Sequence, residues 1–97
     1  MEQIKLRVEH GSCLCTFYHN GKAKVMIIDK VQVNKTYRQK GVGTKLMLKA
    51  LALAKSKKTD CVELVVNKNN LAAKKLYEKI GLVKTNKDYY RRILRTL

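Results

Sequence analysis

The most constraining feature of this chain is a glycine-bearing turn, Arg38-Gln39-Lys40-Gly41-Val42-Gly43, between two stretches of different periodicity. The stretch before it, Val25 to Val33, is apolar and β-branched and predicts a strand, whereas the stretch from about Thr44 repeats apolar residues at helical spacing. Glycine lets the backbone bend tightly, and the first N–H groups of the following helix have no intrahelical partner. The turn therefore predicts a small cradle that fits a phosphate.

The residues before this turn predict three consecutive strands. The first covers the alternating run Ile4 to Val8, and the second runs from Cys13 to Tyr18. Asn20-Gly21 is typical of a tight hairpin turn and leads into the third strand, from Lys24 to about Val33. Within that strand, Asp29-Lys30 interrupts the apolar run and predicts a bulge.

The residues after the turn predict two amphipathic helices separated by a strand. The first helix has about four turns, with an apolar stripe of Leu46, Ala50, Leu53 and Ala54. A short buried strand follows, from Cys61 to Val66, and Asn67 to Asn70 offers turn and N-cap residues. The second helix buries Ala73, Leu76, Tyr77 and Ile80, and Gly81 ends it. The remainder, Leu82 to Leu97, predicts one or two strands. A right-handed crossover should make the strands before and after the first helix parallel neighbours.

The net charge of the chain favours negatively charged partners but does not show which of them it binds. Lys and Arg number 22 against 7 Asp and Glu, a net charge of +15 that attracts polyanions. Nucleic acid, an RNA-rich particle, acidic protein segments and a phosphate-bearing cofactor all stay open, and a charged surface that only confers solubility is the alternative.

Cysteine usage and hydropathy point to a cytoplasmic protein in a reducing compartment. Cys13, Cys15 and Cys61 are odd in number, and the first two are too close to suggest a disulfide framework. The histidines lack the paired spacing of a zinc site, so no metal is expected. No apolar stretch approaches the roughly 20 residues that span a bilayer, so we expect no membrane partner.

Two motifs together resemble the GNAT superfamily of acetyl-CoA-dependent N-acetyltransferases. Val31-Gln32-Val33 followed by Tyr37 to Thr44 is similar to its cofactor motif, in which Arg or Gln, two residues, Gly, one residue and Gly or Ala wrap the pyrophosphate of CoA. Its second motif, Asn-x-x-Ala-x-x-x-Tyr-x-x-x-Gly, is matched by Asn70, Ala73, Tyr77 and Gly81. A lone glycine pattern is weak evidence, but both motifs have the expected order and separation.

The resemblance covers about Val25 to Arg92 and implies one minimal domain, residues 1–97, of the GNAT type. The implied fold is α/β (α+β): a mixed, mostly antiparallel sheet with a central parallel strand pair and two main helices. It also implies acetyl-CoA as acetyl donor, held by Val31, Val33, Arg38, Gln39, Lys40, Gly41, Val42, Gly43, Thr44 and Asn70. The backbone from Arg38 to Thr44 would hold the pyrophosphate, and Val31 and Val33 would pair with the pantetheine arm as a strand would. A plain helix cap would also explain Asn70.

The resemblance makes Tyr77 the candidate general acid, because its phenol can protonate the departing thiolate. A core tyrosine with a polar tip is the alternative. The base is missing at the expected places, because Val65 and Ile27 occupy positions where relatives carry a proton-accepting side chain. Glu63 shares the face of Val65 and is our hypothesis for the base, and an ion-paired Glu explains it equally well. Further possibilities are Tyr37 and Tyr89.

Within the superfamily, Asn86 to Ile93 is similar to protein N-terminal acetyltransferases, in which a tyrosine pair closes over the acceptor peptide. The matching residues are Tyr89 and Tyr90, and ordinary strand aromatics are the alternative. The implied reaction transfers acetyl directly from acetyl-CoA to a protein or peptide amine, an N-terminus or a lysine. The net charge favours an acceptor that is acidic or bound to nucleic acid.

The chain departs from the superfamily in length. Only about 30 residues precede Val31, where the superfamily normally has a strand and two helices that form one wall of the acceptor groove. The acceptor site is then open, or a second copy or partner completes it, or the chain does not catalyse. Two functions follow: a minimal N-acetyltransferase, or a basic GNAT-fold module that binds nucleic acid or the ribosome with little or no transferase activity.

Overall fold

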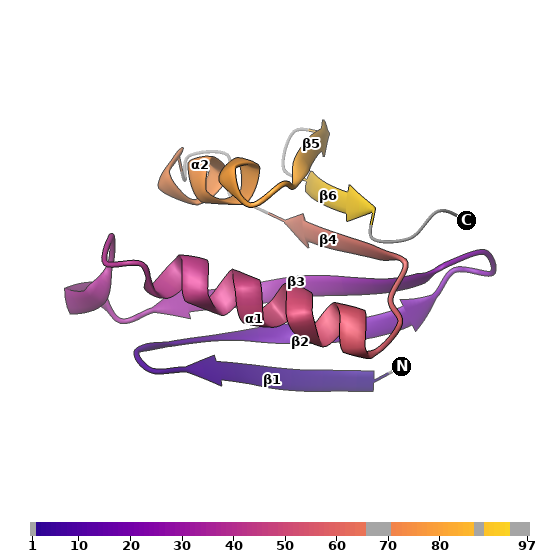
Figure 1. Ribbon diagram of the computed structural model, residues 1–97, viewed down its shortest axis with the longest axis horizontal. Helices are drawn as coiled ribbons and strands as arrows, with labels where there is room; N and C mark the ends of the chain where they lie inside the picture. The colour runs from indigo at the N-terminus through magenta and orange to yellow at the C-terminus, as the bar shows by residue number, and fades with distance from the viewer. Residues whose placement is uncertain (1, 66–70, 87–88, 94–97) are drawn as a thin grey trace.

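A computed structural model describes residues 2–65, 71–86 and 89–93 of the chain (Figure 1). In this part, one sheet has the strand order β1-β2-β3-β4-β6-β5. The strands are β1 Glu2–Val8, β2 Gly11–His19, β3 Lys24–Val33, β4 Cys61–Val65, β5 Val83–Asn86 and β6 Tyr89–Ile93. The helices are α1 Val42–Ser56 and α2 Leu71–Lys79, with a short 3-10 helix, η1, at Lys35–Tyr37.

The sheet is antiparallel except at its centre. Strands β3 and β4 pair in parallel through the crossover helix α1, and the other four neighbouring pairs are antiparallel. This arrangement confirms the expected mixed, mostly antiparallel sheet with a central parallel pair and two main helices. The two C-terminal strands, β5 and β6, confirm that the residues after Gly81 form strands.

The turns follow from local chemistry. At the β2–β3 hairpin, Gly21 has a φ of +91°, and the Asn20 side chain accepts hydrogen bonds from the backbone N–H groups of Lys22 and Ala23 at 3.0 and 2.9 Å. In β3 the predicted bulge is confirmed, because the register with β2 shifts between Gln32 and Asp29.

Several boundaries differ from the prediction, and β1 already begins at Glu2 and not at Ile4. Strand β2 begins at Gly11, two residues before the expected Cys13, because Gly11 pairs with both Val8 and Val33. Helix α1 begins at Val42 and not near Thr44. Gly41, with φ +85°, is its N-cap, and the Gly41 carbonyl accepts the first helical hydrogen bond from the N–H of Lys45 at 3.0 Å.

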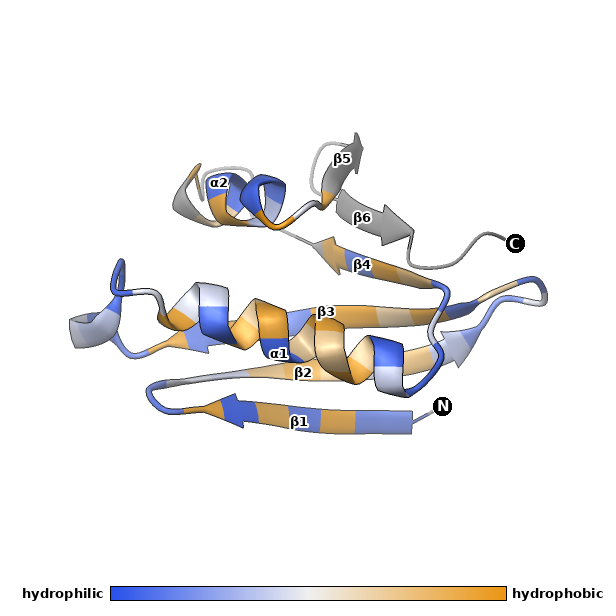
Figure 2. Ribbon diagram, viewed as in Figure 1, coloured by the Kyte–Doolittle hydropathy of each residue, from blue (hydrophilic) through white to orange (hydrophobic). Residues whose placement is uncertain are grey.

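The core lies between α1, α2 and one face of the sheet. Figure 2 shows the apolar stripe along α1 and the alternation of hydropathy along β1. The fully buried members of the core include Cys15, Met26, Ile28, Leu46, Ala50, Val62 and Leu64. The predicted stripe of α1 is confirmed for Leu46, Ala50 and Ala54, whereas Leu53 is only partly buried. The core also takes in Met47 and Leu51 of α1.

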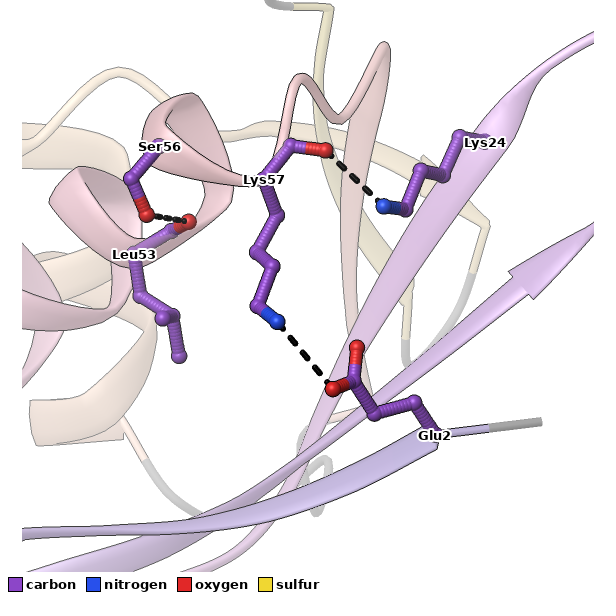
Figure 3. Close-up of polar contacts among 5 residues, drawn as sticks. All are labelled: Glu2, Lys24, Leu53, Ser56 and Lys57. Atoms are coloured by element: carbon purple, nitrogen blue, oxygen red, sulfur yellow. Dashed lines mark hydrogen bonds and ion pairs between the residues drawn. The ribbon is translucent and has the colours of Figure 1, made fainter.

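The end of α1 away from the glycine turn is fixed to the sheet by polar contacts (Figure 3). The ammonium group of Lys57 lies 3.1 Å from a carboxylate oxygen of Glu2 on β1. The ammonium group of Lys24, at the start of β3, donates to the carbonyl of Lys57 at 2.8 Å. Ser56 donates to the carbonyl of Leu53 at 2.8 Å. These contacts satisfy carbonyls at the helix end and hold α1 along β3.

Helix α2 ends as its sequence predicts. Gly81 has a φ of +95° and donates to the carbonyl of Glu78 at 3.1 Å, and Leu82 donates to the carbonyl of Tyr77 at 2.9 Å. This pair of bonds is the Schellman arrangement that a glycine after the helix permits. Leu82 is buried and Tyr77 is 4% exposed, so the cap also turns the chain back into the core.

Candidate functional site

The glycine turn forms the start of α1, just beyond the carboxyl end of β3. Its N-cap is Gly41, which has no side chain that could cap the helix, and the first turn of α1 has no acidic residue. The N–H groups of Val42, Gly43 and Thr44 therefore have no partner within the helix, and no acidic side chain of that turn competes for them. A Cβ placed on Gly41 would meet no atom of the described residues within 4 Å, so the space above it is open in this part of the chain. This geometry suits an anion held by backbone groups.

Basic side chains surround this cradle. Arg38, Lys40 and Lys45 are exposed beside it. The Nε of Arg38 donates to the carbonyl of Val33 at 3.4 Å, which fixes the guanidinium against the end of β3. The Lys40 ammonium lies 5.9 Å from the ring centroid of Tyr37. The residues present therefore fit a doubly charged group such as a pyrophosphate.

The second glycine of the turn has a packing role. A Cβ on Gly43 would lie 3.0 Å from Cδ2 of Leu76 in α2, closer than side chains normally approach. Glycine at this position therefore lets α1 and α2 pack closely. The absence of a side chain at Gly43 is explained by this contact, whether or not its N–H meets a ligand.

An opening in the sheet lies next to this cradle. Strands β3 and β4 pair only from Val25–Cys61 to Ile28–Leu64, yet β3 continues to Val33. Figure 1 shows β3 running on beyond the tip of β4. Among the described residues, the edge of β3 that would face β4 is thus unpaired after Ile28. An extended, amide-bearing ligand could pair with this edge as an added strand would.

Asp29 is the first residue of β3 beyond that last pair, and the sequence had suggested it only as a cause of the bulge. One of its carboxylate oxygens, Oδ1, is buried and has no hydrogen-bond partner among the described residues. An unpaired buried carboxylate oxygen is costly, so its occurrence beside an opening is a functional signal. In the sequence, the only sign of this site is that Asp29 is an acidic residue within the apolar strand that precedes the glycine turn.

Tyr77 lies on the helix-covered face near the same bulge. Burial raises its pKa to about 12, and the nearby Cys13 adds to this shift. Cys13 is opposite the bulged part of β3, and its sulfur lies 4.0 Å from that of Cys15. The hydrogen bond to Cys15, burial and the charges of Cys15 and Asp29 together raise the pKa of Cys13. Both cysteines are buried, as expected for strand cysteines that act as small core residues.

Glu63 and Tyr77, the two predicted catalytic side chains, lie on opposite faces of the sheet. Glu63 alternates with the buried Val62 and Leu64, so it belongs to the face away from the helices. The register puts it next to Ile27 of β3 and, on its other side, next to Arg91 of β6. Tyr77 is part of the core on the helix side. A reaction that uses both would have to take place where β3 and β4 separate.

For three further predicted site residues, the described part of the chain includes only the backbone or nothing: Tyr89, Tyr90 and Asn70. Asn70 is outside the described residues. The backbone of β6 places Tyr89 opposite Val65 and Tyr90 opposite Leu64, but the two tyrosine side chains are outside the described part. Within the described ranges, no three His, Cys, Asp or Glu side chains are grouped so that they could hold a metal ion. The helices of that same part are too short or too polar to cross a bilayer.

Comparisons with known proteins identify the fold. The sequence model of the acetyltransferase (GNAT) family matches residues 10–82. No curated protein matches the sequence. Among solved structures, the chain is similar to one in the crystal structure of the NatC complex bound to Gag peptide and CoA, with 26% identity and a TM-score of 0.75, covering 91% of this chain and 62% of that one.

Two other structures share the fold at lower identity. An acetyltransferase from Bacillus cereus ATCC 14579 is 22% identical with a TM-score of 0.81, covering 96% of this chain and 74% of that one. Arabidopsis thaliana NAA60, in complex with a bisubstrate analogue, is 15% identical with a TM-score of 0.73, covering 86% and 63%. The chain thus covers 62% to 74% of the length of the matched chain in each of these three structures.

Proposed function

The chain belongs to the acetyltransferase (GNAT) family, and on that premise we propose that it transfers acetyl from acetyl-CoA to an amine of a protein or peptide. The observation that carries the proposal is the backbone cradle at Gly41, uncapped at the start of α1 and open above its Cα. The similarity to a chain of a complex that binds a peptide and CoA supports a peptide acceptor.

The cofactor would be held mainly by backbone groups. The N–H groups of Val42, Gly43 and Thr44, with the positive end of the α1 dipole, would bind its pyrophosphate. Arg38, Gln39 and Lys40 surround this position, and the main chain of Val31 and Val33 would pair with the pantetheine arm. Asn70 is also proposed to contact the cofactor, because it matches the first position of the second motif. Acetyl-CoA supplies an acetyl group activated as a thioester.

The acceptor amine must lose a proton to react, and we assign this proton to Asp29. Its partly buried carboxylate lies at the start of the opening between β3 and β4, with one oxygen that accepts no hydrogen bond from the described residues. Glu63 belongs to the adjacent cross-strand row, two residues or about 6.6 Å nearer the start of β3. Glu63 stays a second candidate for the base, acting directly or through water. The carboxylate of Asp29, placed beside the acceptor amine, would accept the proton directly.

Tyr77 is proposed to hold a proton for the departing sulfur. Its pKa of about 12 keeps the phenol protonated at neutral pH. A phenol with so high a pKa is a weak acid, so its contribution to the rate should be modest. Tyr89 and Tyr90 are proposed to contact the acceptor peptide. Completion of the acceptor site by a second copy or another partner stays a prediction.

Two measurements test this function. CoA is titrated calorimetrically into the protein, and release of free thiol from acetyl-CoA is then followed with a panel of peptides. We expect micromolar binding and turnover with at least one peptide. No CoA binding would overturn both the function and the cradle. CoA binding without turnover, accompanied by tight RNA binding, would favour the nucleic-acid or ribosome-binding module instead.

A further inference from the structure

A second candidate site lies beside the β1–β2 turn. It is an open pocket of about 270 Å³, lined by Lys5 and Arg7 of β1, His10 and Ser12 around the turn, and Gln32 and Asn34 at the end of β3. Lys5 and Arg7 carry positive charge, His10 gains it when protonated, and Asp and Glu are absent from the described residues that line the pocket. The lining therefore selects for a negatively charged group.

The strand register explains why these side chains converge. Arg7 pairs with Ser12, and Ser12 pairs with Gln32, so three neighbouring strands present one row of side chains on the same face. Lys5, two residues from Arg7, lies on that face at a separation of roughly 6.6 Å. Neither basic side chain makes a hydrogen bond or ion pair with another described residue. Both charges are available to a ligand.

The histidine side of the pocket is held in place. The imidazole of His10 stacks on Tyr37, with ring centroids 3.4 Å apart and an angle of 5° between the planes. The His10 carbonyl accepts a hydrogen bond from the N–H of Asn34 at 2.8 Å. The Nε2 of His10 lies 3.3 Å from a carboxylate oxygen of Glu9, whose side chain is 87% exposed. An exposed partner of this kind is readily exchanged for a ligand carboxylate.

The pocket lies on the same sheet face as the proposed base. The next row of the sheet contains Lys5, Leu14 and Asp29, in adjacent register on three strands. Asp29 and Arg7 are therefore two strands and two residues apart, which corresponds to roughly 12 Å. An extended peptide covers that distance in about three to four residues.

We propose that this pocket binds an acidic side chain of the acceptor peptide, three or four residues from the amine that is acetylated. The inference depends on the proposed function, because it names the acceptor of that reaction. The cations of Lys5 and Arg7 line one small pocket, which suits a single carboxylate that the guanidinium of Arg7 can bind through two parallel hydrogen bonds. A nucleic-acid strand would instead need cations spaced along its backbone.

Two peptides that differ only by Glu or Gln at the fourth position test this assignment. In the unmodified protein we expect a KM about tenfold lower for the Glu peptide, with a difference that shrinks as salt is added. The double variant Lys5→Gln/Arg7→Gln should lose the preference. The matched control, Lys22→Gln/Lys55→Gln, removes the same charge from exposed positions elsewhere and should keep it.

Equal KM values for the two peptides, or equal loss of preference in both double variants, would overturn the pocket. Anisotropy of labelled peptides measures the same preference without turnover, so it tests the pocket even if no thiol is released. A preference seen by anisotropy together with absent CoA binding would support the pocket and reject the transferase. A single-stranded RNA that displaces the Glu peptide, and binds more tightly than it through Lys5 and Arg7, would reject the peptide as ligand.

Discussion

The two sides of the candidate site are built from different materials. On the cofactor side, backbone N–H groups within a few residues of Gly41 form the cradle at the start of α1. On the acceptor side, the proposed groups are side chains of β1, β3 and β4, and only the pairing of those strands brings them together. A site made of neighbouring backbone groups can be predicted from a short sequence motif. A site made of side chains from several strands can be predicted only when the register of those strands is known.

The cofactor side can be broken by one residue. In Gly41→Asp a negative charge enters the space where phosphate should bind, and we expect CoA affinity to fall at least hundredfold. The fold should persist, because the new Cβ meets no atom within 4 Å and Asp tolerates a φ of +85° better than most residues. Calorimetry measures the affinity, and thermal unfolding measures the stability.

The control is Gly41→Asn, which has nearly the same size and the same tolerance of positive φ without the charge. We expect a loss of about tenfold in affinity. Equal losses in the two variants would mean that space, and not charge, decides binding at this position. Full affinity in Gly41→Asp would remove the cradle.

The acceptor side is tested by exchanging its two carboxylates. For Asp29→Asn we expect kcat/KM to fall about hundredfold, the lower range for loss of a general base. Stability should be kept or raised, because a neutral amide costs less than a carboxylate with one buried oxygen that makes no hydrogen bond to the described residues. For Glu63→Gln we expect a change within threefold. Thiol release with one peptide gives both values, and the reverse pattern would transfer the role of base to Glu63.

Tyr77→Phe tests the proposed proton donor. We expect kcat to fall about tenfold, since a weak acid contributes modestly. The variant should also lose a pH dependence of stability. In the unfolded chain Tyr77 ionises near pH 10, whereas burial keeps it protonated to about pH 12 in the fold. Above pH 10, ionisation of Tyr77 in the unfolded chain therefore lowers the free energy of unfolding.

Urea titrations at pH 8 and pH 11 measure this effect. The free energy of unfolding of the unmodified protein should fall, relative to Tyr77→Phe, by about 1 kcal/mol over this interval. Below about pH 9 the difference between the two proteins should be constant, because the phenol is then protonated in both states. An unaltered rate would leave Tyr77 as a core residue alone, even if the stability effect is found.

Gly43→Ala is the smallest expected change and shows where the cradle ends. The added methyl group presses on Cδ2 of Leu76 at 3.0 Å, while alanine favours the helix by about 0.5 to 1 kcal/mol. We expect the free energy of unfolding to change by less than about 1 kcal/mol and CoA affinity by less than threefold. A large loss of affinity with unchanged stability would place Gly43 within the cradle.

The sequence predicted most of the fold because its local signals agree. The Asn20-Gly21 turn, the Asp29-Lys30 bulge and the Gly81 cap each depend on backbone conformations that few residue types adopt, and each was confirmed. The start of α1 was placed two residues late because the apolar spacing does not reveal that Gly41 already accepts a helical hydrogen bond. Boundaries depend on capping geometry more than on periodicity.

The candidate site was predicted less evenly. The turn from Arg38 to Thr44 was proposed from its motif and Tyr77 from its place in the second motif, and their roles stay predictions. Asp29 was missed as a candidate base, since a single acidic residue in an apolar strand does not show whether it has a partner. The basic pocket at Lys5 and Arg7 was missed as well, because its members come from segments that only the register unites.

By itself, the sequence determined the order of strands and helices, the central crossover and the glycine turn at the start of α1. These depend on periodicity, glycine conformation and helix ends, which act over a few residues. Only the tertiary structure decided that β3 outruns β4 after Ile28, that Asp29 lies at that opening and that Glu63 and Tyr77 lie on opposite faces. Strand pairing joins residues far apart in the chain, so their proximity is a property of the packed sheet.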